Sequence, residues 1–338
     1  MPVHNAGKYL DDAVDSILKQ ENIDLELIII DDHSHDGAIQ ALPDDARIRV
    51  LKSPGRGIVP ALNHGLAHAK GYWLARMDGD DIYAPERLSK QVNYLLEHPY
   101  IDICGTQVDI FKNNGPADEG YRRYQKWINA QITPEQIHHA FFVESCIPHP
   151  SALMRTQQLI ELGGYNNSEW PEDYDLWCRC FVAGLKFGKP EGLLLKWRDY
   201  QTRTSRQDQR YAKHQFLRCK AHYLARYLKD KNITECCIWG TGPTGLKLHD
   251  YLQLEGIEVN GFADINSKMN GRRKRNKPIT IVSDTFNANE LKQFNLMNII
   301  AVSSRGAREH ICSALLARGW QRHKELSLIH ISEPTRPY

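Results

Sequence analysis

One short run of residues constrains the fold of this chain more than any other. Leu-Ile-Ile-Ile stands between Glu26 and two consecutive carboxylates, Asp31 and Asp32. An unbroken apolar run of this length is typical of a strand that is buried on both faces. Strands of a parallel sheet meet their ligands at their carboxyl ends. The run therefore predicts a strand of a parallel α/β sheet, with Asp31 and Asp32 at the ligand edge.

A second strand-like segment, at residues 72–76, is followed closely by Asp-Gly-Asp-Asp at 78–81. A lone D-x-D pair after a strand is usually a solvated turn. Here it is the second of three acidic sites in order, because Glu172 and Asp173 follow further along the chain. Two carboxylates at a strand end can hold one hard cation, and that cation can bind a diphosphate. The ordered series predicts a metal and nucleotide site.

Strand and helix patterns alternate through the first half of the chain, which predicts a doubly wound sheet. The expected elements are strands at 48–51, 72–77, 101–106, 151–155 and 193–197, and helices at 8–20, 58–70, 85–98 and 207–228. The middle of 101–155 is polar and aromatic without a clear period. A chain of 338 residues is long enough for two domains. We expect domains at 1–206 and 232–325, joined by a helical connector at 207–231.

The second domain begins with a glycine-rich turn after the strand-like run at 236–239. Gly240, Gly242 and Gly245 open a predicted helix, and Asp264 ends the next predicted strand. Strand, glycine turn, helix and acidic strand end are the context of a dinucleotide fingerprint. Such a turn can bind a nucleotide phosphate, or it can serve only to pack a helix on a strand. The pattern predicts a small Rossmann-like domain with these four residues as its candidate ligand site.

Composition excludes several classes of protein. Lys and Arg number 43 against 41 Asp and Glu, so no overall basic field for nucleic acid exists, and the basic run at 271–277 is interpreted as a solvated turn. The eight cysteines lack a C-x-x-C pair and predict reduced, buried thiols. No apolar stretch approaches the roughly 20 residues of a membrane span. We expect a cytoplasmic protein. Residues 326–338 resemble a translated sequencing adapter and are expected to be a non-native tail.

The chain resembles family 2 glycosyltransferases of the GT-A fold over about residues 1–211. Five ordered motifs carry the resemblance: Pro2-Val-His-Asn5, Asp31-Asp32-His-Ser, Arg76-Met-Asp78-Gly-Asp80-Asp81, His149-Pro150, and Glu172-Asp173-Tyr-Asp-Leu-Trp177. The resemblance implies a doubly wound, mixed, mostly parallel GT-A sheet in the first domain. Relatives carry a short apolar strand before the first motif, and most of that strand is expected to be missing here.

The resemblance, with the chemistry of each side chain, assigns candidate roles. Asp80 and then Asp78 are the expected ligands of Mg²⁺ or Mn²⁺, and Asp173 is the expected catalytic base. The donor nucleotide sugar is expected to meet Pro2, Val3, His4, Asn5, Asp31, Asp32, Arg56, Arg76, Asp78 and Arg198. The acceptor is expected to lie near His149, Glu172 and Trp177. Acidic residues at 172–175 can also simply cap a helix.

One position departs from the family's pattern. Relatives carry an arginine and then a histidine near the end of the domain, and Arg198 matches whereas Tyr200 stands in place of the histidine. A histidine metal ligand is therefore not expected here. Contacts to the diphosphate would fall to Arg198, Arg203 or Arg206.

The predicted function is transfer of a sugar from a nucleotide-diphosphate sugar to an acceptor hydroxyl, with inversion, in cell-surface polysaccharide or glycan synthesis. The implied partners are that donor and a glycan or lipid-linked acceptor, with peripheral contact at the cytoplasmic membrane face and no nucleic acid. Two alternatives stay open. One is nucleotidyl transfer to a sugar phosphate, which uses a similar sheet and metal. The other is a binding module whose transferase activity has decayed.

Overall fold

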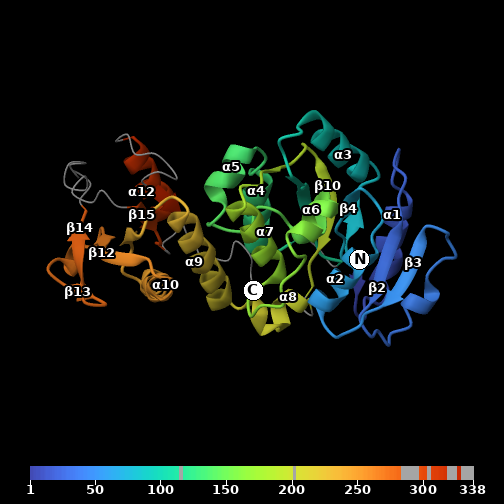
Figure 1. Cartoon of the computed structure of the whole chain (residues 1–338), viewed down its shortest axis with the longest axis horizontal. Coiled ribbons are helices and arrows are strands. Elements are labelled where there is room, and N and C mark those ends of the chain that lie inside the picture. The colour runs from blue at the N-terminus through green and yellow to red at the C-terminus, as the bar shows by residue number, and fades with distance from the viewer. Residues whose placement is uncertain (114–116, 201–202, 283–296, 303–305, 318–325, 329–338) are drawn as a thin grey trace. The chain divides into compact units, whose positions relative to one another are not determined.

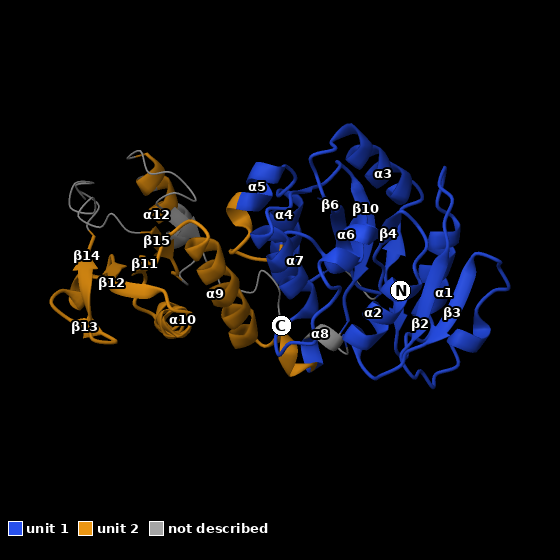
Figure 2. Cartoon of the chain, viewed as in Figure 1, with its two compact units in different colours: residues 1–138, 146–207, 335–337 blue, residues 139–145, 208–334, 338 orange. Residues whose placement is uncertain are grey.

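The computed structural model describes residues 1–113, 117–200, 203–282, 297–302, 306–317 and 326–328 (Figure 1). The chain divides into two compact units (Figure 2). The first comprises residues 1–138 and 146–207, and the second comprises residues 139–145 and the described residues from 208 onward. Each unit is an α/β layer structure with its own sheet, and each is described by itself below.

The first unit begins with three parallel strands in the order β1 (Pro2–Val3), β2 (Leu27–Asp31) and β3 (Ile48–Lys52). The predicted two-sided burial of the apolar run is confirmed. Ile29 packs in the core that α1 (Tyr9–Leu18) covers. On the opposite face Ile30 lies against α2 (Ile58–His68), so closely that a Cβ on Gly65 would be 3.3 Å from the Ile30 side chain. Asp31 and Asp32 therefore emerge at the carboxyl end of a buried strand.

The remaining strands of this unit form two further hydrogen-bonded groups of mixed direction. The first has the order β4 (Trp73–Ala75), β8 (Leu153–Arg155), β6 (Ile103–Cys104) and β9 (Phe187–Gly188). The second has the order β5 (Ile82–Tyr83), β10 (Leu193–Arg198) and β7 (Gln107–Phe111). Because the loop between β4 and β5 joins these two groups, its acidic residues lie where they meet.

Residues 101–155 are more regular than the sequence suggested. They contain α4 (Glu119–Asn129) and α5 (Pro134–Ala140), and neither helix was predicted. In α4 the aromatic and apolar residues Tyr121, Tyr124 and Ile128 recur on one helical face and are all buried. Tyrosine rings, read as a polar and aromatic loop, in fact form the apolar stripe of an amphipathic helix.

The other helices of this unit connect the strands. They are α3 (Arg87–Glu97), α6 (Thr156–Glu161), α7 (Glu172–Val182) and α8 (Thr204–Gln207), with the short 3-10 turns η1 (Ile39–Ala41) and η2 (His149–Ser151). The long helix predicted from residue 207 begins later, as α9 (Lys213–Lys229) in the second unit. It is preceded by η3 (Gln209–Tyr211), where the carboxylate of Asp208 accepts a hydrogen bond from the Arg210 N–H.

The second unit holds one sheet in the order β13-β14-β12-β11-β15-β16. Its pairs are parallel, except for the β13–β14 hairpin. The strands are β11 (Glu235–Trp239), β12 (Glu258–Asp264), β13 (Arg273–Lys274), β14 (Lys277–Ile281), β15 (Met297–Ile300) and β16 (Leu326–Leu328). The helical elements are α9, α10 (Pro243–Leu254), η4 (Ser267–Met269) and α12 (Ala307–Leu316). Strand order reverses direction at β11, which is the Rossmann-like arrangement.

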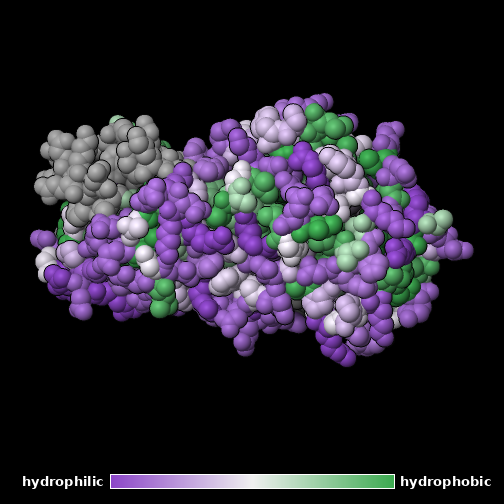
Figure 3. All heavy atoms as spheres, in the orientation of Figure 1, coloured by the Kyte–Doolittle hydropathy of each residue, from purple (hydrophilic) through white to green (hydrophobic). Residues whose placement is uncertain are grey.

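Residues 326–328 of the expected non-native tail form the edge strand β16, and residues 329–338 lie outside the described residues. Within the described ranges, none of the helices has the length and apolar character that a membrane crossing requires. The face seen in Figure 3 is mainly hydrophilic, and its hydrophobic residues gather in small groups. All eight cysteines are buried, as expected of core thiols.

Candidate active site

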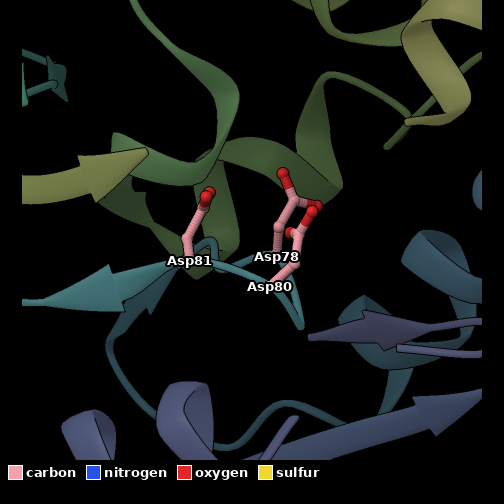
Figure 4. A group of neighbouring side chains, drawn as sticks. All are labelled: Asp78, Asp80 and Asp81. Carbon is pink, nitrogen blue, oxygen red and sulfur yellow. The ribbon is translucent and has the colours of Figure 1, made fainter. Parts of the chain in front are cut away.

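The acidic loop between β4 and β5 gathers three carboxylates. Asp78, Asp80 and Asp81 each offer an oxygen that lies within 4.8 Å of the others. All three side chains project from the same side of the loop (Figure 4). The glycine between the first two packs closely, because a Cβ on Gly79 would be 3.2 Å from the Val3 side chain, which is tighter than an ordinary contact. The predicted pair at 78 and 80 is thus brought together, and Asp81 is an addition.

Asp81 is the most buried member of this cluster. Its side chain is fully inaccessible, and its Oδ1 accepts a hydrogen bond from the Arg198 N–H at 2.8 Å. Its other oxygen, Oδ2, is buried without a hydrogen-bond partner among the described residues. Burial, together with the charges of Asp80 and Asp78, raises the pKa of Asp81 well above its usual value. A third consecutive acid was visible in the sequence, but only burial reveals its unsatisfied oxygen.

The three carboxylates of this loop are suitable ligands for a hard divalent cation. Burial first, and then the charge of Asp78, raises the pKa of Asp80 as well. Carboxylates this close repel one another when ionised, and one of them has a buried oxygen without a hydrogen-bond partner among the described residues, so a cation placed among them would be favoured. Carboxylate oxygens are the ligands that Mg²⁺ and Mn²⁺ prefer. Asp78, Asp80 and Asp81 are therefore the residues that would hold such an ion.

Arg76 lies immediately before this loop and is 4% exposed. Its guanidinium pairs with the Asp78 carboxylate. Although burial acts in the opposite direction, the charge and hydrogen bond of Asp78 raise the pKa of Arg76, with smaller contributions from Tyr165 and Glu172. Arg76 was predicted to contact the nucleotide-sugar donor, and its partner in the structure is the Asp78 carboxylate of the acidic loop.

The end of β10 supports the acidic loop from the other side. The Arg198 guanidinium donates to the Asp80 carbonyl at 2.7 Å and to Asp12 at 3.2 Å, and it stacks on the Tyr9 ring. Its donors are thus engaged by protein groups. The charge of Arg203 acts on both Asp80 and Asp81, and that of Arg76 acts on Asp80 as well.

Arg206, the third candidate for a diphosphate contact, is also engaged. It pairs with the buried Asp199 at 2.8 Å. It also donates to the Tyr121 hydroxyl at 2.8 Å. Of the three arginines considered for the diphosphate, Arg203 is therefore the one best placed by charge.

The predicted nucleotide side is built by β1 and the end of β2. The Asp32 N–H donates to the Val3 carbonyl, and the His4 ring nitrogen Nδ1 lies 2.6 Å from the Asp32 carbonyl. Asp32 Oδ2 accepts from the Gly57 N–H at 2.8 Å, beside the exposed Arg56. Its Oδ1 is buried without a partner among the described residues. Asp32 Oδ1 could therefore accept a hydrogen bond from a ligand at this edge of the sheet.

Asp31 and Asn5 have a different local role. Asp31 Oδ1 accepts from the Ser34 N–H at 2.8 Å, which is a turn cap. Asn5 adopts a left-handed conformation, with φ 51°, and its side-chain oxygen accepts from the His35 N–H. Half-buried Pro2 and buried Val3 form the strand that carries this turn. These residues shape the end of β1 and the turn after β2 through backbone and side-chain hydrogen bonds.

The predicted acceptor side lies at the first turn of α7. Glu172 is 1% exposed and Asp173 is 6% exposed. Asp173 Oδ1 accepts a hydrogen bond from the Tyr174 N–H at 2.7 Å. Asp175 is a structural residue, because it accepts from Trp170 and Arg179 at 2.8 Å each. Asp175 thus ties this turn to Trp170 and Arg179 through side-chain hydrogen bonds, whereas a catalytic role for Asp173 stays a prediction.

His149 and Trp177 are buried beside this turn. The His149 Nε2 lies 2.9 Å from the Tyr165 hydroxyl. Trp177 is 1% exposed and packs edge-on against His149 and Phe187. Trp177 was predicted on the acceptor side, and the structure places its ring in the core behind His149.

Tyr165 links the two halves of the site. Burial raises its pKa, and the charges of Arg76, Glu172 and Asp173 all act on its hydroxyl. Asn63 fixes its backbone by two hydrogen bonds of 2.8 Å. Sequence reasoning missed Tyr165, since a single tyrosine in a Gly-Gly-Tyr turn carries no motif. Charges from both places act on the same side chains: Asp78 and Glu172 both act on Arg76, and Glu172 also acts on Tyr165. The acidic loop and the first turn of α7 therefore lie close enough to interact electrostatically.

Comparison with known proteins identifies the family of the chain. The family described as glycosyl transferase family 2 matches residues 1–163. EpsE of Bacillus subtilis (strain 168), named as a glycosyltransferase, is 30% identical over 209 residues, which are 59% of this chain and 71% of EpsE. The chain belongs to glycosyltransferase family 2. The O-antigen biosynthesis glycosyltransferase WbnJ of Escherichia coli is 29% identical over 243 residues, 69% of this chain and 89% of WbnJ.

A solved structure is also similar at a distance. It is the mannosyltransferase PcManGT of Pyrobaculum calidifontis in complex with GDP-Man and Mn²⁺, with a TM-score of 0.44 and 20% identity over 75% of this chain and 68% of PcManGT. The predicted family and the α/β fold class of this glycosyltransferase are confirmed. The family match ends at residue 163, so the role of Asp173 stays a prediction.

The glycine-rich turn of this glycosyltransferase lies in its second unit. A Cβ on Gly245 would be 2.0 Å from the Gly240 carbonyl oxygen, whereas nothing lies within 4 Å of one on Gly242. Asp264 Oδ2 accepts from the Thr241 N–H at 3.0 Å and from its hydroxyl. Asp264, one of the four candidate ligand residues, therefore closes the turn on itself. Helix packing accounts for Gly245, and a ligand for the turn stays a prediction.

Proposed function

We propose that this glycosyltransferase moves a sugar from a nucleotide-diphosphate sugar to an acceptor hydroxyl, with inversion and with Mg²⁺ or Mn²⁺. The observation that carries the proposal is the trio of crowded carboxylates with a buried, unsatisfied oxygen on Asp81. The relative WbnJ is named for O-antigen biosynthesis. That name favours a glycan or lipid-linked saccharide as the acceptor, met in the cytoplasm or at the membrane face.

The donor would bind along the edge formed by β1, β2 and the acidic loop. Asp32 offers a buried oxygen that suits an N–H of the base. A cation held by Asp78, Asp80 and Asp81 would neutralise the charge that develops on the leaving diphosphate. Arg203 adds positive charge on the same side. The base and the diphosphate would thus be held at separate points, which fixes the position of the anomeric carbon bonded to the diphosphate.

Asp173 would act as the general base. Its carboxylate takes the proton of the acceptor hydroxyl while the acceptor oxygen forms a bond to the anomeric carbon. The bond from that carbon to the phosphate oxygen breaks with its electron pair, and the nucleoside diphosphate leaves. A single displacement inverts the anomeric centre. Glu172 and His149 would orient the acceptor. The charges of Glu172 and Asp173 both act on Tyr165, and the Tyr165 hydroxyl is hydrogen-bonded to His149.

The experiment that tests this proposal is a measurement of product release by wild type and Asp173→Asn. The Asn oxygen can still accept the Tyr174 N–H, so the fold is expected to survive. We expect nucleoside diphosphate release from UDP- or GDP-sugars to need Mn²⁺ and to fall about 10²- to 10⁴-fold in D173N. Asp15→Asn, in an exposed pair with Lys19, is the matched control and should keep wild-type rates.

The alternatives give different products. Release of pyrophosphate instead of a nucleoside diphosphate would identify nucleotidyl transfer. Donor binding without turnover by the wild type would identify a decayed binding module. A wild-type rate in D173N would remove Asp173 as the base while leaving the transferase activity in place.

A further inference from the structure

Tyr200 lies at the edge of the acidic cluster, in a segment tied to the acidic loop. It follows β10 by two residues, and β10 pairs antiparallel with β5, which begins directly after Asp81. Two hydrogen bonds from Arg198 hold the end of β10 to this loop, one to Asp81 at 2.8 Å and one to the Asp80 carbonyl at 2.7 Å. These bonds therefore fix the position of the backbone near Tyr200 relative to Asp80 and Asp81.

The Tyr200 ring rests on a fixed support. Its centroid lies 5.5 Å from the centroid of the Tyr9 ring. Tyr9 is itself held, because the Arg198 guanidinium stacks on its ring at 4.4 Å and its hydroxyl accepts from Asn113 at 2.9 Å. A phenol packed on such a support has little freedom to turn its hydroxyl elsewhere.

The Tyr200 hydroxyl hydrogen-bonds to the Asp80 carboxylate. The phenol O–H is the donor of this bond, and the carboxylate oxygen accepts. A protonated phenol is a poor metal ligand but a good donor to a carboxylate. Partners that orient a ligating carboxylate commonly determine metal affinity.

We propose that Tyr200 is a positioning residue for the cation site: its hydroxyl orients Asp80 so that the carboxylate presents its remaining lone pairs toward Asp78 and Asp81. This inference rests on the proposed cation site. It assigns no metal bond to Tyr200.

The test is Mn²⁺ affinity of the metal-free full chain, measured by electron paramagnetic resonance of free Mn²⁺ with no nucleotide present. Tyr200→Phe keeps the ring on Tyr9 and removes only the hydroxyl. We expect its Mn²⁺ dissociation constant to rise about 10-fold. Tyr72→Phe is the matched control, because Tyr72 is 68% exposed, and it should bind as the wild type does.

The outcomes separate the inference from the function on which it rests. Wild-type Mn²⁺ affinity in Y200F overturns the inference and leaves the cation site standing, even if the thermal midpoint of Y200F falls. No Mn²⁺ binding by the wild type overturns both. Should Y200F fail to fold, Tyr200→His keeps a donor at this position. Y200H is expected to bind Mn²⁺ within about threefold of wild type or tighter, and a loss of tenfold or more overturns the inference.

Discussion

Removing one charge from the acidic cluster should stabilise the metal-free protein. Asp81→Asn keeps an oxygen that can accept the Arg198 N–H, and it replaces the orphaned Oδ2 with an amide donor facing two carboxylates. At 4.8 Å, the largest separation among the three ligand oxygens, two unit charges repel by about 3 kcal/mol at an effective dielectric constant of about 20. Arg203 offsets part of this repulsion. We expect the free energy of unfolding of D81N to rise by about 1 to 2 kcal/mol.

The assay is thermal and urea unfolding in EDTA and again with Mn²⁺. In EDTA the midpoint temperature of D81N should exceed that of the wild type by about 2 to 8 °C. Mn²⁺ at about 100 times its dissociation constant should add about 2.7 kcal/mol to the wild type and less to D81N, because the variant has lost a ligand. Asp118→Asn, at an exposed carboxylate, is the control and should change stability by less than about 0.5 kcal/mol.

A loss of stability in D81N without metal would refute this reasoning. It would mean that the Asp81 carboxylate is favourably paired and not repelled. Equal stabilisation of both proteins by Mn²⁺ would show that the ion binds away from Asp81.

Three further predictions concern other parts of the chain. Burial lowers the pKa of Lys189 from 10.5 to about 8, so between these pH values the folded protein binds fewer protons than the unfolded chain. The free energy of unfolding should therefore rise with pH in this range, by up to about 1.4 kcal/mol per pH unit. Equal pH dependence of the unfolding free energy in wild type and Lys189→Met would contradict this. Gly245→Ala should cost about 3 kcal/mol or more, because its Cβ meets the Gly240 carbonyl, whereas Gly242→Ala should leave the thermal midpoint unchanged. Lastly, EDTA should abolish nucleoside diphosphate release, and Mn²⁺ should restore it; activity that persists in EDTA would remove the metal from the reaction.

The sequence predicted the sheet well where burial alone determines structure. The apolar run before Asp31 has no polar residue to place on a surface, so its two-sided burial followed directly. The helix α4 was missed because its apolar stripe is built largely from tyrosines, whose hydroxyls make a buried face look polar. Short-range patterns are informative only when the chemical class of each side chain is unambiguous.

The site was predictable residue by residue but not in its contacts. The carboxylates at 78 and 80 could be named from their spacing, whereas the orphaned oxygen of Asp81 appears only once Arg198 occupies its partner. Tyr165 was beyond reach for the same reason, and Tyr200 was noted only as a departure from the family's pattern, without its contact to Asp80. Each acts through a residue that lies far away in the sequence, and a single sequence does not encode such pairs in any local pattern.

The tie between Arg198 and Asp81 also has a temporal consequence during synthesis. The two residues are 117 positions apart. At about 5 to 20 residues per second, a ribosome needs roughly 6 to 23 s to add that length of chain. Until then the nascent acidic loop lacks the strand that shapes it. During this time Asp78, Asp80 and Asp81 lack the support of β10, which is the last strand of their unit to be translated. A chain stalled before residue 198 should fail to assemble the site, however well β1, β2 and β3 have already formed.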